Sequence, residues 1–187
     1  AGSVETKKKG KRKKGRAPYD ASLPNVLLIG DSISMGYVGL VQQRLKGVCN
    51  VIRPSGNHQG TTNGLKIVDK LLAAQKKWDV VHFNWGLHDL KHVKVAGTSQ
   101  NSNEATDPQQ ADVATYTANL DMLTAKLKTS GAKMVFATTT AYPDVKSPLR
   151  KASYAVVYNR AAKGVMAKHG VALNDLHGLT APRLKEL

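Results

Sequence analysis

Short apolar runs rich in β-branched residues alternate with longer amphipathic stretches from Leu23 onward. The short runs predict buried strands, and the stretches with apolar residues at helical spacing predict helices. Five strands are expected at residues 25–30, 48–52, 79–85, 133–139 and 171–175. Four helices are expected at residues 37–47, 63–77, 110–131 and 151–170, and a further helical pattern begins at residue 181.

This alternation of strand and helix predicts parallel strands joined by right-handed crossovers, with helices on both faces of the sheet. We therefore predict a three-layer α/β fold that is flavodoxin-like, with a five-stranded parallel sheet in the order 2-1-3-4-5. In such sheets, ligands bind beyond the carboxyl ends of the strands, near the switch point between the first and third strands. Chemistry is therefore expected in the segments that directly follow the strands.

The net charge of +15 is unevenly distributed along the 187 residues. Residues 1–18 hold eight Lys or Arg side chains and one Glu, and their run KKKGKRKKGR has no apolar side chain. Such a run repels itself and cannot bury a core. We predict a disordered basic tail over residues 1–19 and an α/β domain over residues 20–187. The tail is expected to be a solvated linker or a contact to an anionic polymer.

Several classes of protein are excluded by composition. A single cysteine, Cys49, cannot form an internal disulfide framework. No apolar run approaches the roughly 18 residues that a membrane-spanning helix needs. No His and Cys spacing fits a metal site, so neither a metal nor a cofactor is expected.

The first predicted strand ends in Gly30-Asp31-Ser32. Asp31 or Ser32 could cap the following helix by accepting its free N–H groups, and this role alone would explain both residues. Alternatively, Ser32 is a nucleophile, because a helix N-terminus favours developing negative charge and its N–H groups can serve an oxyanion.

Polar segments also follow the second and third predicted strands. The segment RPSGNHQGTTNG (53–64) is either an ordinary turn before a helix or the source of a backbone donor at Gly60, where no side chain blocks approach. In FNWGLHDLKH (83–92), Asp89 could cap a helix while His88 lies on the surface. A cluster of Asn84, His88 and Asp89 at the switch point instead favours a binding site.

Taken together, these segments resemble the SGNH/GDSL hydrolase family. The resemblance rests on GDS at 30–32, GTT at 60–62 and GLHD at 86–89, in that order, each after a predicted strand. It spans most of residues 24–180 and implies the same α/β fold. It also implies an ester hydrolase, and the stretch WDVVHFNWGLHDL is similar to a subgroup of secreted bacterial members.

The resemblance implies a role for each matched position. Ser32 would attack an ester carbonyl, and the backbone N–H groups of Ser32 and Gly60 would be two oxyanion donors. The family's third donor is an Asn in Gly-x-Asn-Asp, but His88 occupies that position here. Either the His88 imidazole or the Asn84 amide would replace it. Further substrate-binding residues are expected at Asp31, Asn57, Asp89 and His92.

The family's general base is a His that follows an Asp by three residues, and no Asp-x-x-His occurs in this chain. Asp175 and His177 are the nearest substitute, and a base beyond the end of a truncated chain is the expectation we prefer. A Ser hydroxyl without a hydrogen-bonded base is a poor nucleophile. The other histidines are expected near the rim (His58, His92), in the core (His82) and at a helix end (His169).

The leading prediction is a serine-dependent hydrolase of an acyl or acetyl ester, on a small molecule or a carbohydrate. We expect a monomer in the extracellular or periplasmic space, although no signal peptide is visible. The alternative is a non-catalytic module of the same fold that binds anionic glycans through the tail, Lys91, His92 and Lys94. A flavodoxin-like cofactor binder is a third possibility, because fold alone does not fix function.

Overall fold

The computed structural model describes residues 19–185 and has one central sheet of five parallel strands. Its strands are β1 (Asn25–Ile29), β2 (Asn50–Ile52), β3 (Val80–Phe83), β4 (Lys133–Ala137) and β7 (Ala172–Asn174). Their order is β2-β1-β3-β4-β7, and every pairing is parallel. The predicted flavodoxin-like order is confirmed, with β7 as the fifth strand. The predicted basic tail lies outside the described residues, apart from Tyr19.

Five α-helices connect or follow these strands in the described part of the chain. They are α1 (Ser32–Arg44), α2 (Thr61–Leu72), α3 (Val113–Lys128), α4 (Ala152–His169) and α5 (Leu176–Thr180), followed by a short 3-10 turn, η1 (Ala181–Arg183). None of the helices within residues 19–185 is long and apolar enough to span a lipid bilayer.

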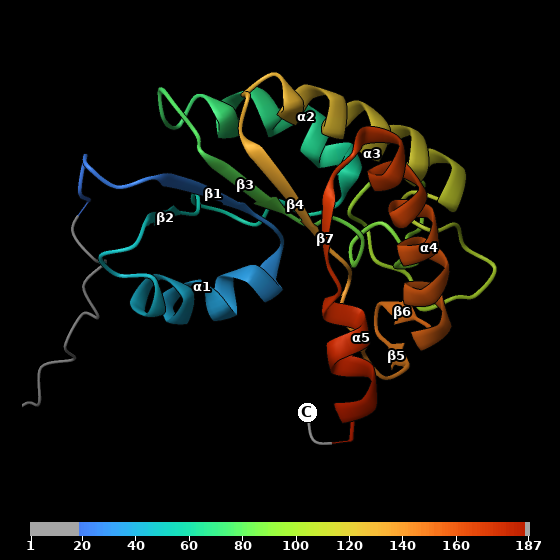
Figure 1. Ribbon diagram of the computed structural model, residues 1–187. Coiled ribbons are helices and arrows are strands. Elements are labelled where there is room, and N and C mark those ends of the chain that lie inside the picture. Colours follow the sequence, from blue (N-terminus) through green and yellow to red (C-terminus); the bar gives the residue numbers. More distant parts are fainter. Residues whose placement is uncertain (1–18, 186–187) are drawn as a thin grey trace, which may run out of the picture.

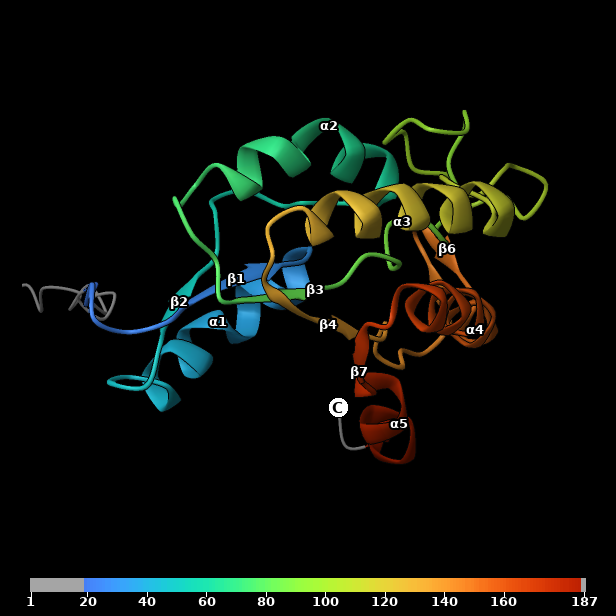
Figure 2. The ribbon, with the colours of Figure 1, turned by 45° about the horizontal axis from the view of Figure 1, so that its top comes forward.

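The helices lie on both faces of the sheet (Figure 1). Figure 2 shows α2 and α3 side by side over one face and α1 under the opposite face. The main core lies between the sheet and the layer of α2, α3 and α4, where Phe83 and Phe136 pack edge to face at a centroid distance of 5.3 Å. Parallel strands covered on both faces bring all their carboxyl ends to one edge, where the predicted polar segments meet.

Helix α1 begins at Ser32, five residues earlier than predicted. Residues 32–36 are instead the first part of the helix, with Asp31, one of the two capping residues considered from the sequence, as its N-cap. Its start was missed because apolar side chains occur on the solvent side as well: Ile33, Met35 and Leu40 are all about half exposed. This removes the amphipathic pattern on which a helix prediction depends.

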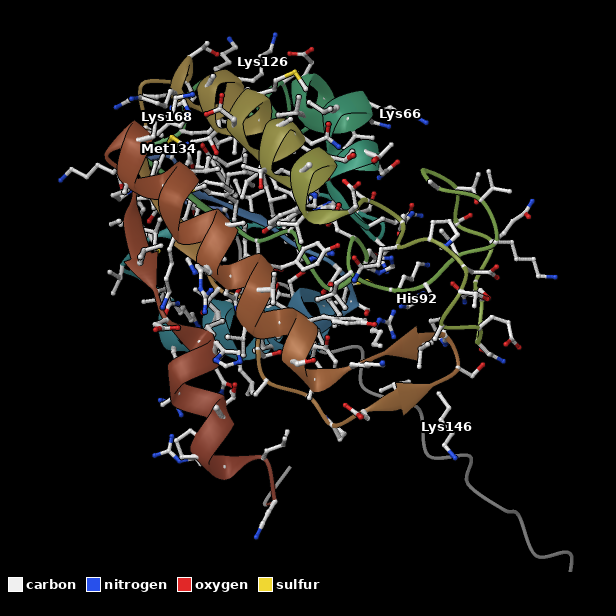
Figure 3. All side chains as sticks on the ribbon, turned by 90° about the vertical axis from the view of Figure 1, so that its right-hand side faces the viewer. Lys66, His92, Lys126, Met134, Lys146 and Lys168 are labelled. Carbon is white, nitrogen blue, oxygen red and sulfur yellow. The ribbon has the colours of Figure 1, made fainter. Side chains whose placement is uncertain are left out.

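A two-stranded antiparallel hairpin follows β4 and is absent from the prediction. It consists of β5 (Val145–Lys146) and β6 (Leu149–Arg150), with Val145 paired to Arg150. Backbone hydrogen bonds from His92 N to Leu149 O (3.0 Å) and from Leu149 N to Ser102 O (2.9 Å) join it to the long loop after β3. In Figure 3, His92 lies beside this hairpin, and Lys146 points away from it into solvent.

Candidate active site

The turn between β1 and α1 carries the candidate nucleophile. The Asp31 carboxylate accepts a hydrogen bond from Ile33 N at 2.9 Å and thereby caps α1. Ser32 is exposed, and its hydroxyl forms no hydrogen bond within residues 19–185. The Ser32 N–H has no intrahelical acceptor, because it lies in the first turn. Asp31 therefore fills the capping role, and both polar groups of Ser32 are free to meet a ligand.

Two buried side chains hold this turn from the segment that follows β2. His58 is 1% exposed, and its Nδ1 accepts the Gly30 N–H at 3.1 Å. Arg53 is 7% exposed and donates from Nη2 to Gly30 O at 2.9 Å and from Nε to Ser34 Oγ at 2.8 Å. Burial, with a smaller contribution from the Arg53 charge, lowers the pKa of His58 to about 4. The His58 imidazole is therefore neutral near pH 7, as its acceptor role requires.

His58 lies in the loop after β2, as predicted, but its ring is buried inside the protein beneath the turn at the end of β1. Its Nε2 atom is buried and has no hydrogen-bond partner among the described residues. Its carbonyl accepts hydrogen bonds from Asn63 Nδ2 at 3.1 Å and Trp85 Nε1 at 3.4 Å. Neighbouring Asn57 is exposed and turns the loop by accepting Gln59 N at 2.9 Å.

The turn between β2 and α2 places Gly60 as the N-cap residue of α2. The Gly60 N–H donates no hydrogen bond within the described residues, so it is also free to meet a ligand. Asp89 lies directly behind this glycine, since a Cβ added to Gly60 would be 2.9 Å from Asp89 Oδ1. Asp89 Oδ1 accepts both Thr61 N (2.8 Å) and Thr61 Oγ1 (2.5 Å).

Asp89 is completely buried, and its second carboxylate oxygen has no partner within the described residues. Burial raises the pKa of Asp89 to about 7, and the hydrogen bonds from Thr61 oppose that rise. Its carboxyl group is thus close to half protonated at neutral pH. In this structure Asp89 fixes the Gly60–Thr61 backbone instead of reaching the surface.

The two candidates for the third oxyanion donor differ in their hydrogen bonds. Asn84 donates from Nδ2 to Ala137 O at 2.7 Å and so links the ends of β3 and β4. The half-buried His88 imidazole has no hydrogen bond within residues 19–185. Burial first, then the charges of Lys91 and Arg150, lower the pKa of His88 to about 4. His88 is therefore neutral, with one ring N–H to donate.

Asp175 and His177 flank the start of α5, but no hydrogen bond joins their side chains. Asp175 accepts hydrogen bonds from Lys163 Nζ (2.9 Å), Thr138 Oγ1 (2.9 Å) and Gly178 N (3.1 Å). These bonds, with the one from Lys163 the strongest, lower the pKa of Asp175 to about 2. His177 is fixed through its backbone, which donates to Thr138 Oγ1 at 2.9 Å. Neither residue is bonded to Ser32.

The remaining histidines have other partners. His92 is 5% exposed, with Nδ1 at 2.7 Å from Asp107 O and Nε2 at 3.1 Å from the Tyr154 hydroxyl. His169 Nε2 is 2.7 Å from Asp121 Oδ1, and His82 Nε2 is 3.3 Å from Asn174 Nδ2. No imidazole within residues 19–185 is hydrogen-bonded to the Ser32 hydroxyl.

A small hollow lies beside the candidate nucleophile, at the carboxyl ends of β1, β3 and β4. Its lining includes Asp31, Ser34, Tyr37, Asn84 and Leu87. The described part of the chain holds no group of three or more His, Cys, Asp or Glu side chains suited to a metal ion. Next to this hollow, Ser32 presents an unbonded hydroxyl and an unbonded backbone N–H, which are groups that acyl transfer uses.

Some residues of this site carry no signal in a single sequence. Arg53 and Arg150 lie outside the three short motifs, and nothing in their neighbours distinguishes them from surface arginines. The position of Arg53 directly after the second strand is the one available clue, because strand ends in this fold line the site. His58 shares that position, but its burial depends on Gly30, a partner 28 residues earlier.

A comparison with models of protein families finds no match, and neither does a comparison with curated protein sequences. Solved structures with the same fold include the acetyl xylan esterase AlAXEase, with a TM-score of 0.65, 17% identity and coverage of 82% of this chain and 78% of that one. A lipase/acylhydrolase from Enterococcus faecalis matches with a TM-score of 0.66 and 22% identity over 84% and 78% of the two chains.

A third structure is LAE5, an alpha/beta hydrolase enzyme from the metagenome of Lake Arreo, Spain. It matches with a TM-score of 0.67 and 17% identity over 92% of this chain and 85% of that one. At these identities the likeness concerns the fold. The chain therefore shares its three-layer α/β fold with solved esterases and acylhydrolases.

Proposed function

We propose that the protein is a serine-dependent ester hydrolase of the SGNH/GDSL type, with Ser32 as the nucleophile. The observation that carries this proposal is the freedom of the Ser32 hydroxyl. Asp31 already caps α1, and the Ser32 side chain bonds to nothing within residues 19–185. An exposed, unengaged hydroxyl at the switch point of a parallel sheet suits a group that reacts with a ligand.

The chemistry would proceed through an acyl-enzyme. Ser32 Oγ attacks the ester carbonyl and gives its proton to a general base, and the carbonyl oxygen becomes an oxyanion. The Ser32 and Gly60 N–H groups stabilise that oxyanion as the C–O bond to the alcohol breaks and the alcohol takes the proton. A water molecule then releases the acid by the same steps. Loss of one donor costs about 2.7–4 kcal/mol in the transition state.

His88 is our choice for the third oxyanion donor. Its imidazole is neutral and unpartnered in the described structure, whereas the Asn84 amide is already bonded to Ala137 O. A neutral imidazole has one N–H, which can donate a hydrogen bond to the oxyanion. The substitution of His88→Asn would restore the amide that the SGNH/GDSL resemblance implies at this position.

The general base is the part of the site that the described contacts do not supply. His177 lies near the site through Thr138, but its imidazole has no bond to Asp175 or Ser32. Among the histidines of this chain, His177 is our candidate for the base. The expected substrate is an acyl or acetyl ester on a small molecule or a carbohydrate, and AlAXEase, which has the same fold, is named an acetyl xylan esterase. Monomeric state and extracellular or periplasmic location stay predictions.

Labelling with a fluorophosphonate probe, together with hydrolysis of p-nitrophenyl acetate, tests the nucleophile. We expect the parent protein to be labelled slowly, because no imidazole is bonded to the Ser32 hydroxyl, and Ser32→Ala to be unlabelled. The matched control is Ser153→Ala, which changes an exposed serine of α4. Equal turnover by Ser32→Ala and the parent would refute the nucleophile assignment.

A second pair of measurements locates the base. The Ser32-dependent hydrolysis of p-nitrophenyl acetate is compared between the parent and His177→Gln, and its pH dependence is measured for both proteins. If His177→Gln abolishes that activity, His177 is the base. If the activity is unchanged, another group is the base.

The alternative of a non-catalytic module for anionic glycans is not favoured by the structure. Two of the residues on which it depends are buried: Lys91 is 5% exposed and bonded to Asn101 Oδ1 at 2.8 Å, and His92 is 5% exposed. Only Lys94 of that group is exposed. These side chains therefore do not form a basic surface for a glycan.

A further inference from the structure

The β5–β6 hairpin brings an arginine to the rim of the candidate active site. Arg150 is the last residue of β6, and its Nε donates to Leu87 O at 3.1 Å. Leu87 lines the hollow together with Asp31, and it directly precedes His88. The hairpin is joined to the loop after β3 through Leu149, so the position of Arg150 is determined by backbone pairing.

The two terminal nitrogens of the Arg150 guanidinium, Nη1 and Nη2, have no hydrogen-bond partner within the described residues. Nε is used by Leu87 O, whereas neither Nη1 nor Nη2 donates a hydrogen bond to any described residue. Arg150 is partly exposed, and its nitrogens are absent from the fully buried unpartnered atoms of residues 19–185. The two terminal N–H₂ groups are thus available to a ligand at the rim.

The surroundings of Arg150 carry more positive than negative charge. Lys91 is 5% exposed and bonds to the neutral Asn101, and lysines are seldom buried without a charged partner. Neither Arg150 nor Lys91 forms an ion pair within residues 19–185. Burial, and for Lys91 also the Arg150 charge, lowers the pKa of both groups.

The other ionisable groups that act on Arg150 are Asp31, Tyr142 and His88. His88 and Tyr142 are neutral near pH 7, since the pKa of His88 is lowered to about 4 and that of Tyr142 is raised above its ordinary value. Asp31 is the one carboxylate of the three, and it is bonded to Ile33 N. An anion at the rim would therefore be attracted by two cations, Arg150 and Lys91, and repelled by one carboxylate, Asp31, whose pKa is raised by burial.

We propose that Arg150 binds a carboxylate group of the ester substrate, so that the enzyme prefers esters that carry a negative charge close to the scissile bond. A guanidinium with Nε occupied still presents Nη1 and Nη2 side by side, which matches the two oxygens of a carboxylate. The inference rests on the proposed function, because Ser32 defines the scissile bond. Uronic acid esters and half-esters of dicarboxylic acids both have this chemistry.

The experiment uses two pairs of esters that differ in charge. For a carboxylate on the alcohol side, the pair is 4-acetoxybenzoate and its methyl ester. For a carboxylate on the acyl side, it is the mono-p-nitrophenyl ester of succinic acid and p-nitrophenyl butyrate. The measured quantity is the ratio of kcat/KM for the anionic ester to that for the neutral one, which cancels general losses of activity.

We expect Arg150→Gln to lower this ratio by about 10- to 100-fold for one of the two pairs, as loss of a charged hydrogen bond implies. The pair of esters whose kcat/KM ratio falls shows whether the carboxylate lies on the alcohol side or the acyl side of the ester. Arg150→Lys should keep part of the preference for the anionic ester, because lysine retains the positive charge but lacks the paired N–H donors of a guanidinium. The control is Arg160→Gln, which removes an equal charge from an exposed site on α4.

Binding to Ser32→Ala separates this inference from the proposed function. Ligand-observed NMR gives the affinity for 4-acetoxybenzoate and mono-p-nitrophenyl succinate without any turnover. Tighter binding of one anionic ester than of its neutral partner, lost in Ser32→Ala/Arg150→Gln, would support the carboxylate site even if Ser32 is not the nucleophile. Equal binding of charged and neutral esters, with unchanged kcat/KM ratios in Arg150→Gln, would overturn it.

Discussion

The two sides of the candidate site are built in different ways. On the side of β1 and β2, Arg53, His58 and Asp89 are all less than 10% exposed and are bonded to the backbone of the two turns. On the side of β7 and α5, the Asp175–Lys163 ion pair has both side chains close to half exposed. One side depends on buried hydrogen bonds, and the other on a solvated ion pair together with part-buried hydrogen bonds to Thr138.

This difference indicates which part of the site is preorganised. A buried polar group that loses its partner costs about 1–3 kcal/mol, so the turns that hold Ser32 and Gly60 resist displacement. An exposed ion pair contributes about 0–1 kcal/mol, and the part-buried hydrogen bonds to Thr138 add to it, so α5 is held by weaker contacts than the two turns. We infer that the proposed oxyanion donors are in place before a ligand binds, whereas α5 can adjust to it.

The strongest test of this contrast is Arg53→Met. Its guanidinium is bonded to Gly30 O, Asp31 O, Pro54 O and Ser34 Oγ, which would all lose a donor. We expect the free energy of unfolding to fall by about 3 kcal/mol, measured by urea denaturation. Arg160→Met, at an exposed position, should change it by less than about 0.5 kcal/mol. Equal effects of the two variants would show that the buried hydrogen bonds of Arg53 do not stabilise the turn.

Gly60→Ala tests the close approach between Asp89 and the turn before α2, which contains the proposed oxyanion donor Gly60. The added Cβ would lie 2.9 Å from Asp89 Oδ1, so the turn must shift. We expect a loss of about 2 kcal/mol in stability and a reduction of fluorophosphonate labelling by about 10-fold or more. The control is Gly36→Ala in α1, where nothing lies within 4 Å of the new Cβ. That variant should be stabilised by about 0.5–1 kcal/mol.

Asp89→Asn tests the buried carboxyl through its pH dependence. The raised pKa of about 7 means that the folded protein keeps a proton that the unfolded chain releases near pH 4. The contribution of Asp89 to stability is therefore fully present below about pH 4 and declines as the pH rises to about 7.

An asparagine cannot titrate, so Asp89→Asn should gain about 3 kcal/mol relative to the parent between pH 4 and pH 7. Denaturation of both proteins at several pH values gives this difference. The contributions of the other titrating groups to the free energy of unfolding cancel, because both proteins contain them. A constant difference across this range would show that the Asp89 carboxyl ionises normally.

The smallest effect is expected for Asp175→Ala. Loss of the cap on Gly178 N and of the exposed ion pair should cost about 1 kcal/mol. The rate of Ser32 labelling should follow only the folded fraction, because Asp175 is not bonded to the His177 imidazole. Lys163→Ala is the matched partner, since it removes the ion pair and leaves the cap. A large loss of labelling in Asp175→Ala alone would place Asp175 in the reaction.

The strand order could be predicted because alternating strands and helices leave few topologies open. The sites after the strands followed from that order, so Ser32, Gly60 and Asp89 were placed at the correct edge. The β5–β6 hairpin was missed, because its strands have two residues each and show no period. The burial of His58 and the position of Arg150 depend on Gly30 and Leu87, which are distant in the chain.

The hydrogen bonds that build the candidate site connect distant parts of the chain. His58 and Gly30 are 28 residues apart, as are Asp89 and Thr61. Such contacts form only when β1, β2 and β3 have paired, because closing long loops is entropically costly before the sheet exists. A partly folded or newly made chain would therefore present the Ser32 hydroxyl without ordering the proposed oxyanion donors. Reactivity at Ser32 should appear only once β1, β2 and β3 have paired, and the appearance of labelling would report that pairing.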